Sequence, residues 1–256
     1  MPDPIDRAKY AAAHRAAAFV EDGMRVGLGT GSTAAWMVRR LGERVREEGI
    51  ALRGVPTSER TADLARRCGV PLATLDEVGR LDVTIDGADE ADPNLDLIKG
   101  AGAALLREKI VAAASDLLVI VADPSKRVGT LGASALPVEV VPFGWRATKA
   151  LVEDALAGQD VDARAVSVRE RDGAPVRTDG GNLLLDLRLG RIGDPRRLAA
   201  ALVRVPGVID TGLFLGMAGV LVTGHPDGRV ELRDAAGTTT EDRIEVDDAA
   251  LGLRDD

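Results

Sequence analysis

The stretch VGLGTGSTAAW, residues 26–36, places three glycines, two threonines and one serine between a short apolar run and a predicted helix. The run MRVGL, which ends in this stretch, is typical of a buried strand, and Ser32 is expected to cap the helix. A glycine-rich turn between a parallel strand and a helix gathers backbone N–H groups and the positive end of the helix at one place. The sequence therefore predicts an anion site at this turn, and phosphate is the simplest anion to expect.

Two familiar uses of such a turn do not fit. Ser32 stands where the dinucleotide fingerprint has its third glycine, and the next predicted strand ends in GVPTS, which has no carboxylate for a ribose diol. The Gly-Lys-Ser/Thr of a nucleotide P-loop is also missing from the turn. Hydroxyls of Thr30, Ser32 and Thr33 beside the backbone of Gly31 suit one small phosphate or the hydroxyls of a sugar. The alternative is a tight turn in which Ser32 only caps a helix.

Helical stretches alternate with short apolar runs on both sides of this turn, as in a parallel sheet. Strands are expected at residues 24–28, 50–55, 70–75, 81–86 and 117–123. Helices are expected at residues 6–20, 32–49, 58–68 and 103–114. The predicted fold class is α/β, an open, mostly parallel, Rossmann-like sheet with helices on both faces and a smaller inserted α+β domain.

The domain boundaries follow from a change of pattern after residue 134. We expect a discontinuous catalytic domain at residues 1–134 and 207–232, in which GVIDTGLF and GVLVTG return to the first sheet. The small α+β domain is expected at residues 135–206. Residues 233–256, with eight acidic residues against three arginines, are expected to form a loosely ordered acidic tail.

Composition excludes several classes of protein. A net charge of −8 and a pI near 5.0 argue against a nucleic-acid partner. No apolar run approaches the length of a membrane span and the N-terminus does not resemble a signal peptide, so a cytoplasmic protein without a membrane partner is expected. The single cysteine, Cys68, cannot form an internal disulfide. The only two histidines, His14 and His225, are expected at the surface.

Four carboxylates follow the strand at residues 81–86. The segment TIDGADEAD holds Asp86, Asp89, Glu90 and Asp92 at the edge where open parallel sheets bind ligands. Acids this close repel one another unless cations or ligand hydroxyls lie between them. A divalent metal is the competing interpretation, but neither histidine is near the acids in sequence, and we expect no metal site.

A second glycine turn, KGAG at residues 99–102, leads into a helix with three successive charged residues, Arg107, Glu108 and Lys109. Helical positions differ by 100°, so at least one of these side chains must face apolar surface. The positions three and four residues from Glu108 are all apolar, and such a setting raises the pKa of a carboxylate and makes it a usable base. Periodicity alone does not choose among the three.

Lysine usage marks two further candidates. The chain has only five lysines among its 33 basic residues, and a lysine supplies a compact point charge that arginine does not. Lys99 opens the second glycine turn, and Lys126 follows the predicted strand at residues 117–123. Both are therefore expected at the ligand edge of the sheet.

Four segments in this order resemble the motifs of the type A ribose-5-phosphate isomerase family: GLGTGSTA (27–34), DGADE (86–90), KGAGAALLREK (99–109) and ADPSK (122–126). LPVEVVP (136–142) and GLF (212–214) fit the same pattern. The chain departs from it at Ala101, where the family has a glycine, and in the acidic tail.

The resemblance implies isomerisation of D-ribose 5-phosphate to D-ribulose 5-phosphate in the non-oxidative pentose phosphate pathway, with no metal or organic cofactor, by a homodimer or homotetramer. Glu108 is implied as the base that moves a proton through an enediolate. Lys99, Asp86 and Asp89 would be the other catalytic residues. The residues implied to bind the substrate are Lys9, Thr30, Gly31, Ser32, Thr33, Asp86, Gly87, Ala88, Asp89, Lys99, Gly100, Ala101, Gly102 and Lys126.

Two other functions compete with this interpretation. One is another phosphosugar enzyme on a similar scaffold, such as a deaminase or a lactonase. The other is the sugar-phosphate sensor domain of a transcription regulator, which would need a DNA-reading module. No basic helix-turn-helix segment is visible in the sequence.

Overall fold

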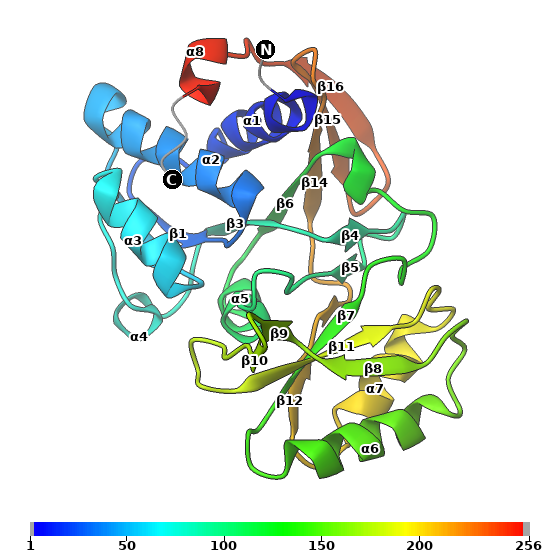
Figure 1. Ribbon diagram of the computed structural model, residues 1–256. Helices are drawn as coiled ribbons and strands as arrows, with labels where there is room; N and C mark the ends of the chain where they lie inside the picture. Colours follow the sequence, from blue (N-terminus) through cyan, green and yellow to red (C-terminus); the bar gives the residue numbers. More distant parts are fainter. Residues whose placement is uncertain (1–2, 253–256) are drawn as a thin grey trace. The chain divides into compact units, whose positions relative to one another are not determined.

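The computed structural model describes residues 3–252 and divides into two compact units (Figure 1). The first unit comprises Met1–Gly87, Ile110–Arg127 and Met217–Asp256. The second unit comprises Ala88–Lys109 and Val128–Gly216. This division assigns residues 88–109 and 128–134 to the second unit, whereas the expected boundary at residue 134 places them in the first domain.

The first unit is built on a seven-stranded sheet, in the order β2-β1-β3-β6-β14-β15-β16 (Figure 1). Its five parallel strands are β1 (Met24–Leu28), β2 (Leu52–Pro56), β3 (Val83–Gly87), β6 (Leu118–Ala122) and β14 (Val220–Gly224). Two antiparallel strands extend one edge, β15 (Arg229–Asp234) and β16 (Thr239–Arg243). The mostly parallel sheet confirms the predicted fold class.

Helices cover both faces of the parallel part of this sheet, where β3, β6 and β14 are buried along most of their length. Neighbouring positions along a strand face opposite ways, and on β2 Leu52 packs in one apolar cluster while Val55 packs in another. The cluster of Leu52 includes side chains of α1 (Pro4–Ala17) and α2 (Ser32–Glu43). Val55 packs instead with Val111, in the part of α5 (Leu105–Ala113) that belongs to the first unit.

The remaining helices of the first unit are short. They are the π-helix η1 (Arg44–Glu48), α3 (Glu59–Arg67), α4 (Leu75–Val78), the 3-10 helix η2 (Pro124–Lys126) and α8 (Asp248–Leu251). Among the helices of residues 3–252, none is long and apolar enough to cross a lipid bilayer.

The second unit holds a four-stranded antiparallel sheet in the order β12-β7-β11-β8, one face of which is covered by two helices that contact each other (Figure 1). Its strands and helices are β7 (Leu136–Val140), β8 (Ala165–Val168), β11 (Leu183–Arg188), β12 (Val208–Thr211), α6 (Trp145–Leu156) and α7 (Pro195–Leu202). A three-stranded ribbon is formed by β4 (Glu90–Ala91), β5 (Leu97–Ile98) and β13 (Leu213–Phe214). A hairpin is formed by β9 (Glu170–Arg171) and β10 (Ala174–Pro175).

Three expected elements were wrong. Residues 70–75 form no strand of the sheet, because only Leu72 makes a bridge, to Gly54, and Thr74 caps α4 in a reciprocal pair with Glu77. GVIDTGLF does not return to the first sheet, since β12 pairs with β7 and β13 with β5. The acidic tail is not a loose extension over its described part, because β16 pairs with β15 and completes the sheet.

His14 also differs from its expected place at the surface. It lies in α1, where its ring stacks on that of Tyr10 with centroids 3.8 Å apart. Burial, with a smaller effect of the Arg40 guanidinium, lowers the pKa of His14 from 6.5 to about 4.

A pH dependence of stability follows from this histidine. Below pH 6.5 His14 is protonated in the unfolded chain, whereas in the folded chain it stays neutral until about pH 4. The free energy of unfolding therefore falls as the pH drops through this range. We expect His14→Gln to remove a fall of up to about 3 kcal/mol between these limits. Urea unfolding of the unaltered protein and of His14→Gln at several pH values measures the free energy of unfolding. If plots of this free energy against pH stay parallel for the two proteins from pH 7 to 4, the prediction is wrong.

Candidate active site

The glycine turn lies at the point where the order of the parallel sheet reverses. In the sheet, β1 lies between β2, the next strand in sequence, and β3. In open α/β sheets, ligands bind outside the carboxyl ends of the strands at such a switch point. The residues that follow β1 there are Gly29, Thr30 and Gly31, and β3 ends there in Asp86 and Gly87.

Asp86 holds the glycine turn in place. Its buried carboxylate accepts a hydrogen bond from the backbone N–H of Thr30 (3.0 Å) and one from that of Gly87 (2.7 Å), both at Oδ1. A side chain at position 29 would collide with it, because a Cβ on Gly29 would lie 2.2 Å from Asp86 Oδ1. A glycine is therefore needed where the turn passes this carboxylate.

A cluster of hydroxyl groups surrounds the side chain of Thr30. Its Oγ1 lies 2.8 Å from the hydroxyls of Thr57 and Ser58 and 3.2 Å from that of Thr61, in the segment after β2. All four residues are buried. The hydroxyl of Thr30 is thus used to fasten the turn to its neighbour. Sequence reasoning missed this cluster, although TSERT begins two residues after the end of a predicted strand and is therefore expected at the same sheet edge.

The start of α2 differs from the expectation that Ser32 caps it. Gly31 is the N-cap residue, with φ +119°, and no side chain caps the helix there. Ser32 is the first helical residue and is exposed, and Thr33 is half-buried. The helix N-terminus therefore presents backbone N–H groups and the Ser32 side chain at the turn.

The two lysines expected for substrate binding in this unit lie in different settings. Lys126 ends η2, directly after β6, and is half-buried. Because β6 pairs with β3 in the parallel sheet, Lys126 follows a strand at the same edge as Asp86. Lys9 lies within α1, where its ammonium is 4.0 Å from Asp6. Its role in phosphate binding stays a prediction.

In the second unit, Asp89 holds the other glycine turn. Its Oδ2 accepts the backbone N–H of Ala101 at 2.9 Å. Arg169, which sequence reasoning missed, donates to the carbonyl oxygens of Gly100 (2.9 Å) and Ala101 (3.1 Å), and is itself paired with Asp186. Ala88 is half-buried, and Gly102 is exposed in the same turn as Ala101. The turn is thus held by a carboxylate on one side and a guanidinium on another.

The geometry of this turn indicates that position 101 does not need the glycine that the family has there. Within the described chain, the turn takes positive φ at Gly100 (+106°) and Ala103 (+63°), and Ala101 is exposed. A Cβ on Gly100 would also lie 2.9 Å from the Cβ of Leu105.

A pair of variants tests whether the turn needs a glycine at position 100 but not at position 101. We expect Ala101→Gly to leave kcat/KM within about twofold, and Gly100→Ala to destabilise the fold by roughly 1–3 kcal/mol because of strain and overlap. Thermal unfolding and initial rates measure both. A large loss in Ala101→Gly, or none in Gly100→Ala, would contradict the geometry.

The side chains of Lys99 and Glu108 form a buried ion pair. Lys99 Nζ lies 3.5 Å from Glu108 Oε1, and the two side chains are only 2% and 4% exposed. Of the three successive charges on α5, Glu108 is the buried one, since the side chains of Arg107 and Lys109 are 41% and 19% exposed. Burial therefore identifies Glu108 as the charged side chain of the three that faces the interior, which periodicity alone did not decide.

An aromatic ring supports this pair. Phe214, fully buried at the end of β13, has Lys99 Nζ 5.4 Å and Lys109 Nζ 4.9 Å from its ring centroid. Lys109 donates to Asp210 Oδ1 at 2.5 Å and to the carbonyl of Thr211 at 2.6 Å. Burial lowers the pKa of Lys109, and the bond to Asp210 partly opposes that shift. Sequence reasoning noted GLF only as part of a family pattern.

The other two acids of the cluster are used inside the second unit. Glu90 is buried and accepts the backbone N–H groups of Gly132 (2.7 Å) and Ser134. Asp92 accepts those of Asn94 (2.8 Å) and Asp96 (2.9 Å). Both side chains therefore shape loops.

Each unit offers a chemistry of its own. The first has a helix N-terminus, hydroxyls and a lysine at a sheet edge, which suit a phosphate. The second has a buried carboxylate 3.5 Å from a buried ammonium, which suits proton abstraction with stabilisation of a negative oxygen.

Comparisons with known proteins agree with this chemistry. The family model of ribose 5-phosphate isomerase A (phosphoriboisomerase A) matches residues 53–228. The chain is 61% identical over 244 residues to ribose-5-phosphate isomerase A from Jannaschia sp. (strain CCS1), covering 95% of this chain and 93% of that protein.

Solved structures show the same relationship. A D-ribose-5-phosphate isomerase in complex with phospho-erythronic acid has a TM-score of 0.83 and 38% identity, covering 90% of this chain and 99% of that one. Ribose 5-phosphate isomerase A from Methanocaldococcus jannaschii has a TM-score of 0.80 and 37% identity, covering 88% of this chain and 97% of that one. The chain belongs to the ribose 5-phosphate isomerase A family and is an aldose–ketose isomerase.

Proposed function

We propose that this protein interconverts D-ribose 5-phosphate and D-ribulose 5-phosphate through an enediolate, as a step of the non-oxidative pentose phosphate pathway, with Glu108 as the base. The observation that carries the proposal is the buried pair of Lys99 and Glu108, 3.5 Å apart. A carboxylate removed from water is a stronger base than one in solvent, and a neighbouring ammonium stabilises charge where it develops.

The reaction needs one proton to move between adjacent carbons. Glu108 accepts the proton of C2, the electron pair of the broken C–H bond forms the C1–C2 double bond, and the C1 oxygen becomes negative. The ammonium of Lys99 stabilises that oxygen. The hydroxyl proton of the C2 oxygen then passes to the C1 oxygen, Glu108 returns its proton to C1, and the C2 oxygen becomes the carbonyl, so one carboxylate serves both carbon–proton transfers.

The remaining site residues would hold the sugar and its phosphate. Asp86 and Asp89 would bind sugar hydroxyls and assist opening of the furanose ring, which must precede formation of the carbonyl. The residues proposed to bind the phosphate are Thr30, Gly31, Ser32, Thr33, Lys126 and Lys9.

The related structure that holds phospho-erythronic acid supplies a ligand for testing this arrangement. That compound combines a phosphate with a carboxylate, which resembles the two oxygens of an enediolate. We expect it to inhibit competitively and to bind more tightly than ribose 5-phosphate.

The experiment that tests the proposal is turnover of ribose 5-phosphate in EDTA, followed by the appearance of ribulose 5-phosphate. The proposal requires no metal and no organic cofactor, so full activity is expected in the chelator. Absence of turnover would favour the lactonase, deaminase or sensor alternatives. A homodimer or homotetramer and a cytoplasmic location stay predictions, and light scattering of the purified protein measures the first.

A further inference from the structure

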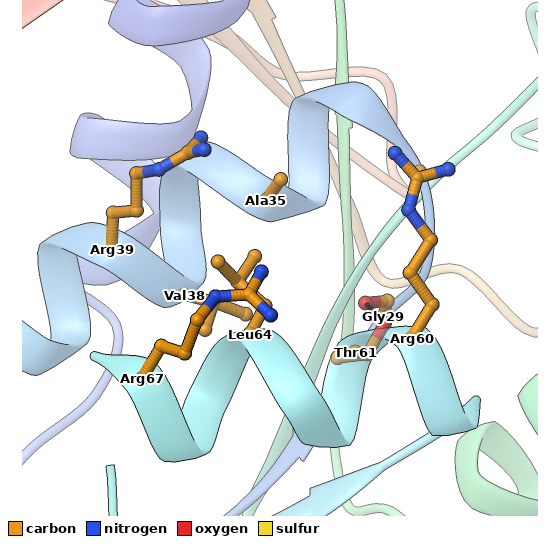
Figure 2. Close-up of a pocket in the computed structure, with 9 residues that line it drawn as sticks. Gly29, Ala35, Val38, Arg39, Arg60, Thr61, Leu64 and Arg67 are labelled. Atoms are coloured by element: carbon orange, nitrogen blue, oxygen red, sulfur yellow. Dashed lines mark hydrogen bonds between the residues drawn. The ribbon is translucent and has the colours of Figure 1, made fainter. Parts of the chain in front are cut away.

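A cavity of about 90 Å³ lies between α2 and α3, within the first unit (Figure 2). Its lining residues include three arginines, Arg39, Arg60 and Arg67, and its apolar wall includes Val38 and Leu64. None of the lining residues in the described chain is acidic. The cavity is thus a concentration of positive charge on a protein whose net charge is −8.

The positions of the arginines follow from the helices that carry them. Arg60 and Arg67 are seven residues apart on α3, which is two helical turns, so their Cα atoms are about 10.5 Å apart on one face. Figure 2 shows both side chains rising from α3 on either side of Leu64, toward α2. Arg39 comes from α2, and its guanidinium lies 4.9 Å from the ring of Trp36.

Guanidinium groups spread over two turns favour an anion with more than one charged group. A planar guanidinium donates two parallel hydrogen bonds to phosphate oxygens, and such charge-assisted bonds are stronger than neutral ones. One phosphate satisfies one such fork, whereas a diphosphate offers oxygens to two. We propose that this cavity binds a diphosphate group through arginines that are not among the residues assigned to the sugar phosphate.

The cavity reaches the back of the substrate turn. Gly29 and Gly31, on either side of Thr30, are among its lining residues, as is Thr61. Thr61 donates its hydroxyl hydrogen to the carbonyl of Gly29 at 3.0 Å, so the turn and the cavity share a wall. Of the residues proposed to bind the sugar phosphate, Gly31 lines the cavity, whereas Ser32, Thr33 and Lys126 do not.

Calorimetric titration with inorganic pyrophosphate tests the proposal, with ribose 5-phosphate present at saturation to occupy the substrate site. We expect one bound pyrophosphate per chain, and about tenfold or greater weakening in the double variant Arg60→Gln/Arg67→Gln. Both arginines are exposed, so these substitutions leave the core intact. Arg66→Gln is the matched control, because Arg66 lies on the same helix, pairs with Asp63 and does not line the cavity.

The outcomes separate this site from the substrate site. Binding that survives ribose 5-phosphate and is lost in the double variant supports it. Binding that ribose 5-phosphate abolishes would assign pyrophosphate to the substrate turn and overturn it. Equal weakening by Arg66→Gln would show a general effect of charge, and absence of binding by the unaltered protein would overturn the proposal directly. The titration reads binding alone, so failure of the proposed isomerase activity would not affect it.

Discussion

Replacing Glu108 by glutamine is expected to lower kcat for ribose 5-phosphate by about 10³-fold or more, with KM changed little. Glutamine has nearly the size of glutamate but cannot accept the C2 proton. Since Glu108 is buried beside Lys99, the amide also leaves that ammonium without its carboxylate. Initial rates over a range of substrate concentrations measure the effect.

A neighbouring residue supplies the control. Arg107 lies on the same helix, but its side chain is 41% exposed and pairs with Asp179. Arg107→Gln should therefore keep kcat within about threefold. An active Glu108→Gln protein, or an equal loss in both variants with normal unfolding temperatures, would remove Glu108 from the role of base.

Replacing Lys99 by methionine is expected to lower kcat/KM by about 10²- to 10³-fold, because the enediolate oxygen loses its cationic partner. Methionine keeps most of the volume and the contact with Phe214, from whose ring centroid Lys99 Nζ lies 5.4 Å. The substitution also leaves the buried Glu108 carboxylate without this ammonium, so we expect a lower free energy of unfolding as well.

Lys109→Met separates these two effects. Lys109 contacts the same ring but is bonded to Asp210 and Thr211. Its loss should cost roughly 1–3 kcal/mol of stability and less than tenfold in kcat. Equal losses of kcat/KM in the two lysine variants would show that Lys99 acts through the fold and not on the reacting oxygen.

Much of the first unit could be predicted because its signals are local. Each parallel strand is a short apolar run, and each is followed by residues that must lie at one edge of the sheet. This reasoning places the turn at residues 29–31 and Asp86 together, and the structure has them joined by a hydrogen bond of 3.0 Å. Glu108 could be named as a candidate, but only its burial separates it from Arg107 and Lys109.

The rest depends on pairings between distant segments, which periodicity does not encode. The strand β12 reads like a core strand of the first sheet, yet it pairs with β7 in the second unit. The sequence of β16 is rich in charged residues and does not look like a strand, yet β16 pairs with β15 along its whole length. Arg169 donates a hydrogen bond to the carbonyl of Gly100, which lies 69 residues away in the sequence. The residues around Arg169 in the sequence do not predict that contact. The hydroxyl cluster around Thr30 likewise combines two loops.

The most direct test of the central claim follows the proton itself. Ribose 5-phosphate is incubated with the protein in deuterated water, and deuterium at C1 and C2 is measured by NMR spectroscopy. If Glu108 transfers the proton, the unaltered protein introduces deuterium, and Glu108→Gln, folded and saturated with substrate, introduces none above the uncatalysed rate. Exchange by Glu108→Gln at the rate of the unaltered protein would contradict the account, because another group would then remove the proton.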